Sequence, residues 1–111
     1  MIEITILEHL KYALNTDRVF LEMPKDTSGS FVVFTVKDRT KTNQLEAVTI
    51  EVCSYAESKY ASALLDQNVR EAMEDADSLE DIMAAVFSNG NDSPDTSLKK
   101  YRYRSYFNIT F

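Results

Sequence analysis

Residues 101–111 read YRYRSYFNITF and alternate between two kinds of side chain. One face carries the aromatic and aliphatic set Tyr101, Tyr103, Ser105, Phe107, Ile109 and Phe111. The other face carries Arg102, Arg104, Tyr106, Asn108 and Thr110. A period of two residues is typical of a β-strand with one buried face. The segment therefore predicts a structural strand, with Phe111 ordered within or beside the core.

Two segments earlier in the chain show a related pattern. Residues 31–38, FVVFTVKD, are apolar on both faces before they turn polar, and residues 46–56, EAVTIEVCSYA, alternate. The polar stretch RTKTNQ, residues 39–44, separates them. Together they predict a long antiparallel hairpin with a six-residue connection. A shorter run, RVFLEMP at residues 18–24, predicts a strand that ends at the proline.

Helical periodicity predicts up to three helices, at residues 2–14, 59–76 and 79–87. Ser78 and Asp81 have the spacing of a capping box for the third helix, and Asn89 with Gly90 predicts its end. The sequence thus predicts one α+β domain over residues 1–111. We expect a mostly antiparallel sheet of about four strands with two to three helices packed on it.

Composition is that of one folded unit, with 44% hydrophobic residues in 111. Cys53 is the single cysteine and lies inside a predicted strand, so we expect a buried, reduced thiol and a reducing compartment. No apolar run approaches the ~18 residues that span a bilayer. Glu3 and Glu8 stand where a signal peptide carries basic residues, so we expect no export or membrane segment.

The net charge of −6 argues against direct binding to nucleic acid, which depends on basic residues that neutralise phosphates. The charge is unevenly distributed. Residues 66–95 hold nine acidic residues and one basic residue, whereas residues 96–111 hold four basic residues and no acidic one.

Candidate catalytic groups are few, and we expect no enzyme, cofactor or metal site. His9 is the only histidine, and no nucleophile is paired with it in the sequence. No phosphate-binding glycine loop or zinc ligand set occurs. A run of acids lacks the spacing of a calcium loop and is predicted to form a solvated helix face or an electrostatic surface. These acids are Glu71, Glu74, Asp75, Asp77, Glu80 and Asp81.

The face of the last strand with Arg102, Arg104 and Tyr106 is the best candidate for recognition. Two interpretations stay open: an exposed edge strand protected by charge, or a subunit interface. Under the interface hypothesis, acids of a neighbouring copy meet these arginines and produce a head-to-tail ring. The candidate acids are Glu71, Glu74 and Asp75.

The order of the segments and their residue composition resemble those of the tail terminator or tail completion proteins of long-tailed phages. The resemblance rests on LEHLKYAL (7–14), VFLEMP (19–24), FVVFTVKD, VTIEVCSYAESKYAS (48–62) and the closing YRYRSYFNITF. Residues 78–97 do not match that pattern. The resemblance implies an α+β subunit that forms a ring, commonly six-fold, caps the tail tube and joins the head connector.

The same resemblance implies a place in the virion tail, assembly in the host cytoplasm, and no catalytic residues. Its implied partners are further copies of the chain, the tail tube protein and a head-completion or connector protein. Another neck connector, an adaptor or stopper, is an alternative. A third hypothesis is an acidic decoy, whose carboxylates in residues 66–95 mimic a phosphate backbone and block a nucleic-acid-binding protein.

Overall fold

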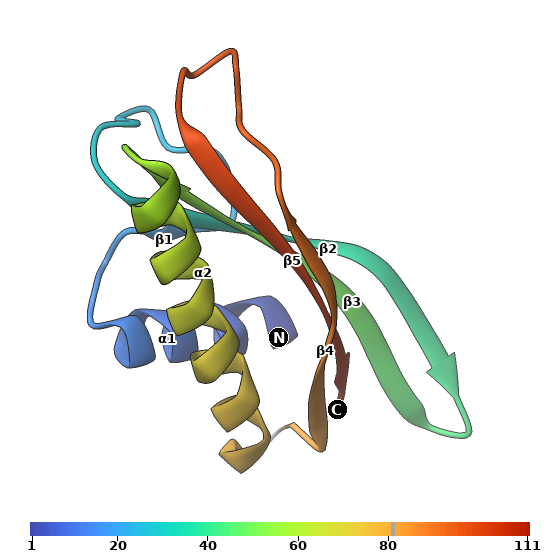
Figure 1. Cartoon of the computed structure of the whole chain (residues 1–111). Coiled ribbons are helices and arrows are strands. Elements are labelled where there is room, and N and C mark those ends of the chain that lie inside the picture. Colours follow the sequence, from blue (N-terminus) through green and yellow to red (C-terminus); the bar gives the residue numbers. More distant parts are fainter. Residues whose placement is uncertain (81) are drawn as a thin grey trace.

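The structure, a computed structural model, describes residues 1–80 and 82–111, and there it places two α-helices on one face of a five-stranded sheet (Figure 1). The helices are α1 (Ile2–Leu14) and α2 (Lys59–Glu74), with a short 3-10 helix, η1 (Asp75–Ser78), after α2. The strands are β1 (Val19–Phe20), β2 (Phe31–Thr42), β3 (Leu45–Ala56), β4 (Ala84–Asp92) and β5 (Tyr101–Thr110).

The order of strands in the sheet is β1-β2-β3-β5-β4. The β1–β2 pair is parallel, and the other three pairs are antiparallel. The predicted α+β class with a mostly antiparallel sheet is therefore confirmed for the described residues, with five strands instead of about four.

The hairpin of β2 and β3 is longer than the sequence pattern indicated. Strand β2 continues through the polar residues 39–42, and the six-residue connection is reduced to a turn at Asn43 and Gln44. Both turn residues have a positive φ, 53° and 69°, as in the type I′ turn that matches the twist of two-residue hairpins. The hairpin extends past the rest of the sheet, and the molecule measures 44 Å along its long axis and 23 Å across (Figure 1).

The core lies between the helices and the sheet face that they cover. Strands β3 and β5 present inward side chains in register, with Ile50 opposite Phe107 and Val48 opposite Ile109. The predicted inward face of the last strand is thus confirmed for Ser105, Phe107 and Ile109, whereas Tyr101 at its start is exposed. Phe111, one residue beyond β5, is half-buried against the same core.

Helix α1 has the predicted bounds and contacts α2. It ends at Asn15, which adopts the left-handed conformation at φ 53°, a common helix C-cap. His9 on α1 donates from Nε2 to the carbonyl of Ala72 on α2, at 2.6 Å. The histidine is therefore a contact between the helices.

Helix α2 turns polar residues toward the sheet, which the predicted apolar stripe did not include. Asp66 and Ser62 are buried, whereas Leu64 of the predicted stripe is exposed. The carboxylate of Asp66 accepts a hydrogen bond from the hydroxyl of Ser105 in β5. Arg70, one turn later, places its Nε 2.9 Å from the same carboxylate.

The predicted third helix at residues 79–87 is wrong, because strand β4 begins at Ala84 and pairs along β5. The apolar spacing in residues 79–87 fits a helical period. The segment forms a strand instead, because the backbone of β5 needs hydrogen-bond partners on the side away from β3, and β4 supplies them.

The residues expected to cap that helix have other roles. Gly90 lies within β4, where an added Cβ would come within 2.7 Å of the Arg70 guanidinium and 2.9 Å of the Ser105 hydroxyl. Ser78 ends η1 and donates its hydroxyl to the carbonyl of Asp75 at 2.6 Å. Asp81, the other half of the expected capping box, lies outside the described residues.

Candidate interaction surface

The face of the sheet away from the helices carries a row of charged side chains on β3 and β5. The antiparallel register sets Glu51 opposite Tyr106 and Cys53 opposite Arg104. Side chains alternate between the two faces along a strand, and the even-numbered residues of β3 and the odd-numbered residues of β5 face the helices. The odd-numbered residues of β3 and the even-numbered residues of β5 therefore lie on the face away from the helices. We call this side of the sheet the open face.

Glu51 is the centre of the polar contacts on the open face. Tyr106 donates its hydroxyl to the Glu51 carboxylate at 2.7 Å, Arg104 Nε lies 3.6 Å from it, and Lys37 Nζ lies 3.7 Å from it. Burial raises the pKa of Glu51, but the hydrogen bond from Tyr106 and the two cations outweigh burial, so the pKa lies below its ordinary value. Glu51 is therefore held ionised beside Arg104.

Arg102 holds the loop that leads into β5. Its guanidinium donates to the carbonyl of Ser93 at 2.8 Å, lies 3.6 Å from the Asp95 carboxylate, and stands over the ring of Tyr55 at 5.8 Å. The Asp95 carboxylate also accepts hydrogen bonds from Ser97, and these lower the pKa of Asp95. Arg102 is thus fixed by its own chain.

Among the sequence-predicted site residues, Arg102, Arg104 and Tyr106 are brought together on one face, as expected. The edge-strand interpretation is wrong, because β5 lies between β3 and β4. The carboxylates that face the two arginines come from the same chain, where the hypothesis had placed them in a neighbouring copy. A contact between copies at this face stays a prediction.

The predicted acids lie on the other side of the molecule. Glu71 and Glu74 near the end of α2, and Asp75 in η1, are exposed on the helical side of the sheet. The structure does not bring them near Arg102 or Arg104. Among residues 1–80 and 82–111, no ion pair involves the exposed acids that we call the acidic group: Glu71, Glu74, Asp75, Asp77 and Glu80.

The neighbour of the charged row, Cys53, is buried, as predicted. Burial raises the pKa of the Cys53 thiol to about 11, and the Glu51 carboxylate adds to the rise. In the part of the chain that the structure describes, no three His, Cys, Asp or Glu side chains gather as a metal site. No described helix is long and apolar enough to span a membrane.

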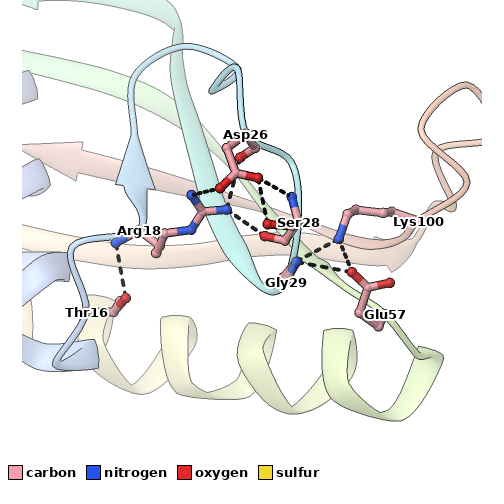
Figure 2. Close-up of polar contacts among 7 residues, drawn as sticks. All are labelled: Thr16, Arg18, Asp26, Ser28, Gly29, Glu57 and Lys100. Atoms are coloured by element: carbon pink, nitrogen blue, oxygen red, sulfur yellow. Dashed lines mark hydrogen bonds and ion pairs between the residues drawn. The ribbon is translucent and has the colours of Figure 1, made fainter.

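A second polar cluster, which sequence analysis did not single out, fixes the loop of residues 21–30 (Figure 2). The Arg18 guanidinium donates to the carbonyls of Asp26 and Ser28 at 3.0 and 2.7 Å. The Asp26 carboxylate in turn accepts hydrogen bonds from the amide and hydroxyl of Ser28. The Asp-x-Ser-Gly sequence of residues 26–29 indicates a turn. No sequence pattern indicates that Arg18 binds this turn.

Lys100, the residue before β5, belongs to the same cluster (Figure 2). Its nearly buried side chain donates to the carbonyl of Gly29 at 2.7 Å and to the carboxylate of Glu57 at 2.5 Å. The ammonium group also lies 5.6 Å from the centre of the Phe31 ring. These contacts join the loop of residues 21–30 to the end of β3 and to the residue before β5.

Comparisons with known proteins find a protein with a similar fold but none with a similar sequence. No protein-family model matches the chain, and a search of curated protein sequences finds no match. A solved structure, "Virion of native gene transfer agent (GTA) particle", contains a chain with the same fold. The TM-score is 0.69 at 10% sequence identity, over 95% of this chain and 90% of that chain. This likeness establishes a shared fold over nearly the whole of both chains.

Proposed function

We propose that this chain is a structural subunit of a phage-like virion. The observation that carries the proposal is the match in fold to a chain of the gene transfer agent virion, which spans nearly all of both chains. The sequence resemblance to phage tail proteins, found from residues outside 78–97, supports the same class.

Within this class, we infer a tail terminator or completion protein that forms a ring, six-fold as the sequence resemblance implies. Such a subunit acts by contact, and the surfaces of this chain suit contact. The open face presents fixed cations, and the helical side presents the acidic group. The proposed partners are further copies, the tail tube protein and the head connector.

Deletion of the gene in cells that produce the particle tests this function. The proposal predicts overlong tails and heads without tails in negative-stain electron micrographs, with recovery when the intact gene is returned. Tails of normal length that fail to join heads would favour an adaptor or stopper. Normal particles that lack the chain by mass spectrometry would contradict a virion role.

A further inference from the structure

Strand β4 forms one edge of the sheet. Its only edge protections among the described residues are a bulge between Phe87 and Asn89 and the charge of Asp92 at its end, so its first half, from Ala84 to Phe87, is unprotected. Exposed edge strands usually carry charges or proline, which prevent pairing with other chains. Residues 84–91, AAVFSNGN, contain neither. Apolar side chains are also exposed along this edge: Met83 at 66%, Val86 at 57% and Phe87 at 39%. The edge thus has the character of a surface that another strand covers.

The hydrogen-bond pattern shows which backbone groups of β4 are free. Glu46 and Phe111 exchange both backbone hydrogen bonds, so the odd-numbered residues of β5 bond to β3 and the even-numbered ones bond to β4. The bond from the Ser93 amide to the Arg102 carbonyl agrees with this assignment. The residues of β4 that direct their backbone outward are therefore Ala85, Phe87, Gly90 and Asp92.

Strand β2 offers a matching free edge on the opposite side of the sheet. Strand β1 pairs only with Val32 and Val33 among the described residues. The Val32 amide donates to the Arg18 carbonyl, and this fixes the alternation along β2 across its bulge. The later residues of β2 that direct their backbone outward are Phe34, Val36, Arg39 and Lys41.

The two edges have complementary charge. The free part of β2 carries Lys37, Arg39 and Lys41 beside a single acid, Asp38. Each of the three cations also lies near a carboxylate of its own chain, but their side chains stay 47–67% exposed and can meet a second carboxylate. The start of β4 follows directly after the acidic group, whose members Asp77 and Glu80 are exposed. An edge with cations at one end of the sheet and an edge beside carboxylates at the other suit each other.

The geometry of the sheet determines the relative direction of the two edge strands and which of their residues lie opposite one another. β4 runs antiparallel to β2, because three antiparallel pairs separate the two strands. A copy moved sideways in the same orientation therefore presents β2 antiparallel to β4. Across the sheet, Ala84 lies level with Thr110, Ala47 and Thr40. At this level Ala85 meets Arg39 of the next copy, and both direct their backbone outward.

We propose that copies of this chain join head to tail by pairing β4 of one copy with residues 34–42 of β2 in the next. The interface is heterologous, since two different edges meet, so it closes into a ring when the rotation between copies allows it. A continuous sheet then runs from subunit to subunit. This inference rests on the proposed function, because it supplies the seam of the proposed ring.

Disulfide trapping in the assembled particle tests the pairing. Thr40 and Ala84 face each other as a non-hydrogen-bonded pair in the inferred register, at the spacing that suits a disulfide. We introduce Thr40→Cys and Ala84→Cys, singly and together, with Cys53→Ala in every variant. Particles that carry these chains are oxidised and run on non-reducing gels.

The proposal predicts a ladder of linked chains from the double variant, no linkage from either single variant, and only dimers from a mixture of the two. A matched control pairs Thr40→Cys with Thr96→Cys in an exposed loop and yields no ladder. Chains that enter particles without a ladder overturn the pairing and leave the virion role intact. Linkage of a single variant to a different protein also overturns it. Absence of every variant from particles, wild type included, overturns the proposed function itself.

Charge exchange gives a second test that needs no disulfide. Lys41→Glu lowers the number of joined particles by about tenfold, because it sets like charges across the seam. The change also removes the contact of Lys41 with Glu46 in the same chain, so the restoring variant is needed to assign the loss to the seam. Adding Glu80→Lys in the same chain restores that number. Recovery supports the seam, and an unchanged yield for Lys41→Glu in chains that enter particles contradicts it. The matched control is Lys25→Glu, an exposed lysine in the loop of residues 21–30.

Discussion

The buried carboxylate of Asp66 on α2 accepts a hydrogen bond from the buried hydroxyl of Ser105 on β5. Arg70 lies beside the same carboxylate, and its guanidinium stands 4.1 Å from the centre of the Phe87 ring on β4. One polar cluster thus joins α2, β5 and the edge strand β4. The position of β4, and with it the edge proposed as the seam, depends on these contacts.

Asp66 should give the stability of the protein a distinctive pH dependence. Burial raises the pKa of Asp66 above its ordinary 3.8, so the folded state holds this proton more tightly than the unfolded state. The contribution of Asp66 to the free energy of unfolding therefore falls as the pH rises through that window. We expect Asp66→Asn to gain stability relative to wild type as the pH rises above the ordinary pKa of 3.8, because asparagine has no proton to lose. Urea unfolding at several pH values measures this, and a constant difference would refute it.

Glu51 should act in the opposite direction. The contacts with Tyr106, Arg104 and Lys37 place the pKa of Glu51 below 4.5, so its stabilising effect is present above that value and is lost as the pH falls through the folded pKa. Glu51→Gln should lower the free energy of unfolding by about 1–3 kcal/mol near neutral pH, with the loss shrinking in acid. Tyr106→Phe, which removes one hydrogen bond, should cost about 0.5–1.5 kcal/mol. Equal losses at all pH values would count against an ionised Glu51.

The two glycines should respond differently to substitution. Gly90→Ala places a Cβ against Arg70 and Ser105 and should cost about 1–3 kcal/mol, with Gly90→Asn costing more. Gly29 has φ 69° with open space around it, so Gly29→Ala should cost about 1 kcal/mol and Gly29→Asn less, because asparagine tolerates this backbone. Thermal unfolding of the four variants measures this contrast. A tolerated Gly90→Asn would show that the close packing at β4 is absent.

Removal of residues 105–111 should prevent folding. The deletion takes away Phe107 and Ile109, both fully buried, and separates β4 from the sheet. Truncation of a buried aromatic side chain typically costs ~3–5 kcal/mol, against a total stability of ~5–15 kcal/mol for a small domain. Circular dichroism of the shortened chain measures the outcome. A cooperative thermal transition would show that the end of the chain is a free arm.

The role of the arginine pair in assembly needs variants that keep the fold. Arg102→Gln with Arg104→Gln removes both charges without opposing the Asp95 and Glu51 carboxylates. If this face is an interface, folded double variants should produce particles with abnormal tails or unjoined heads. Circular dichroism provides the control for folding. Normal particles from the folded variant would show that the open face is not an interface in the particle.

Periodicity was sufficient to predict the elements with strong local patterns. The alternation of residues 101–111 predicts β5, and the apolar stripe of residues 2–14 predicts α1 with its end at Asn15. Strand β4 was not predicted, because its apolar residues fit a helical period. Its exposed position at the edge of the sheet also removes the alternation of apolar and polar residues that is typical of a strand. Only the pairing with β5, a contact between distant segments, decides between the two structures.

The charged contacts escaped prediction for a similar reason. Nothing local in the sequence links Glu51 to Arg104, or Asp66 to Ser105, because the register of β3 with β5 and the packing of α2 bring them together. The sequence correctly grouped Arg102, Arg104 and Tyr106 on one face, since that grouping follows from the period of a single strand. It assigned their acidic partners to another copy because residues 96–111 contain no acid, whereas the actual partners are Asp95, just before that segment, and Glu51 on β3.

A cryo-electron microscopy reconstruction of the particle neck tests the central claim most directly. The account predicts a closed ring of copies of this fold at the end of the tail that meets the head, with β4 of each copy beside β2 of the next in one continuous sheet. Density for this fold at another place in the particle, or a ring whose subunits leave β4 exposed, would contradict it.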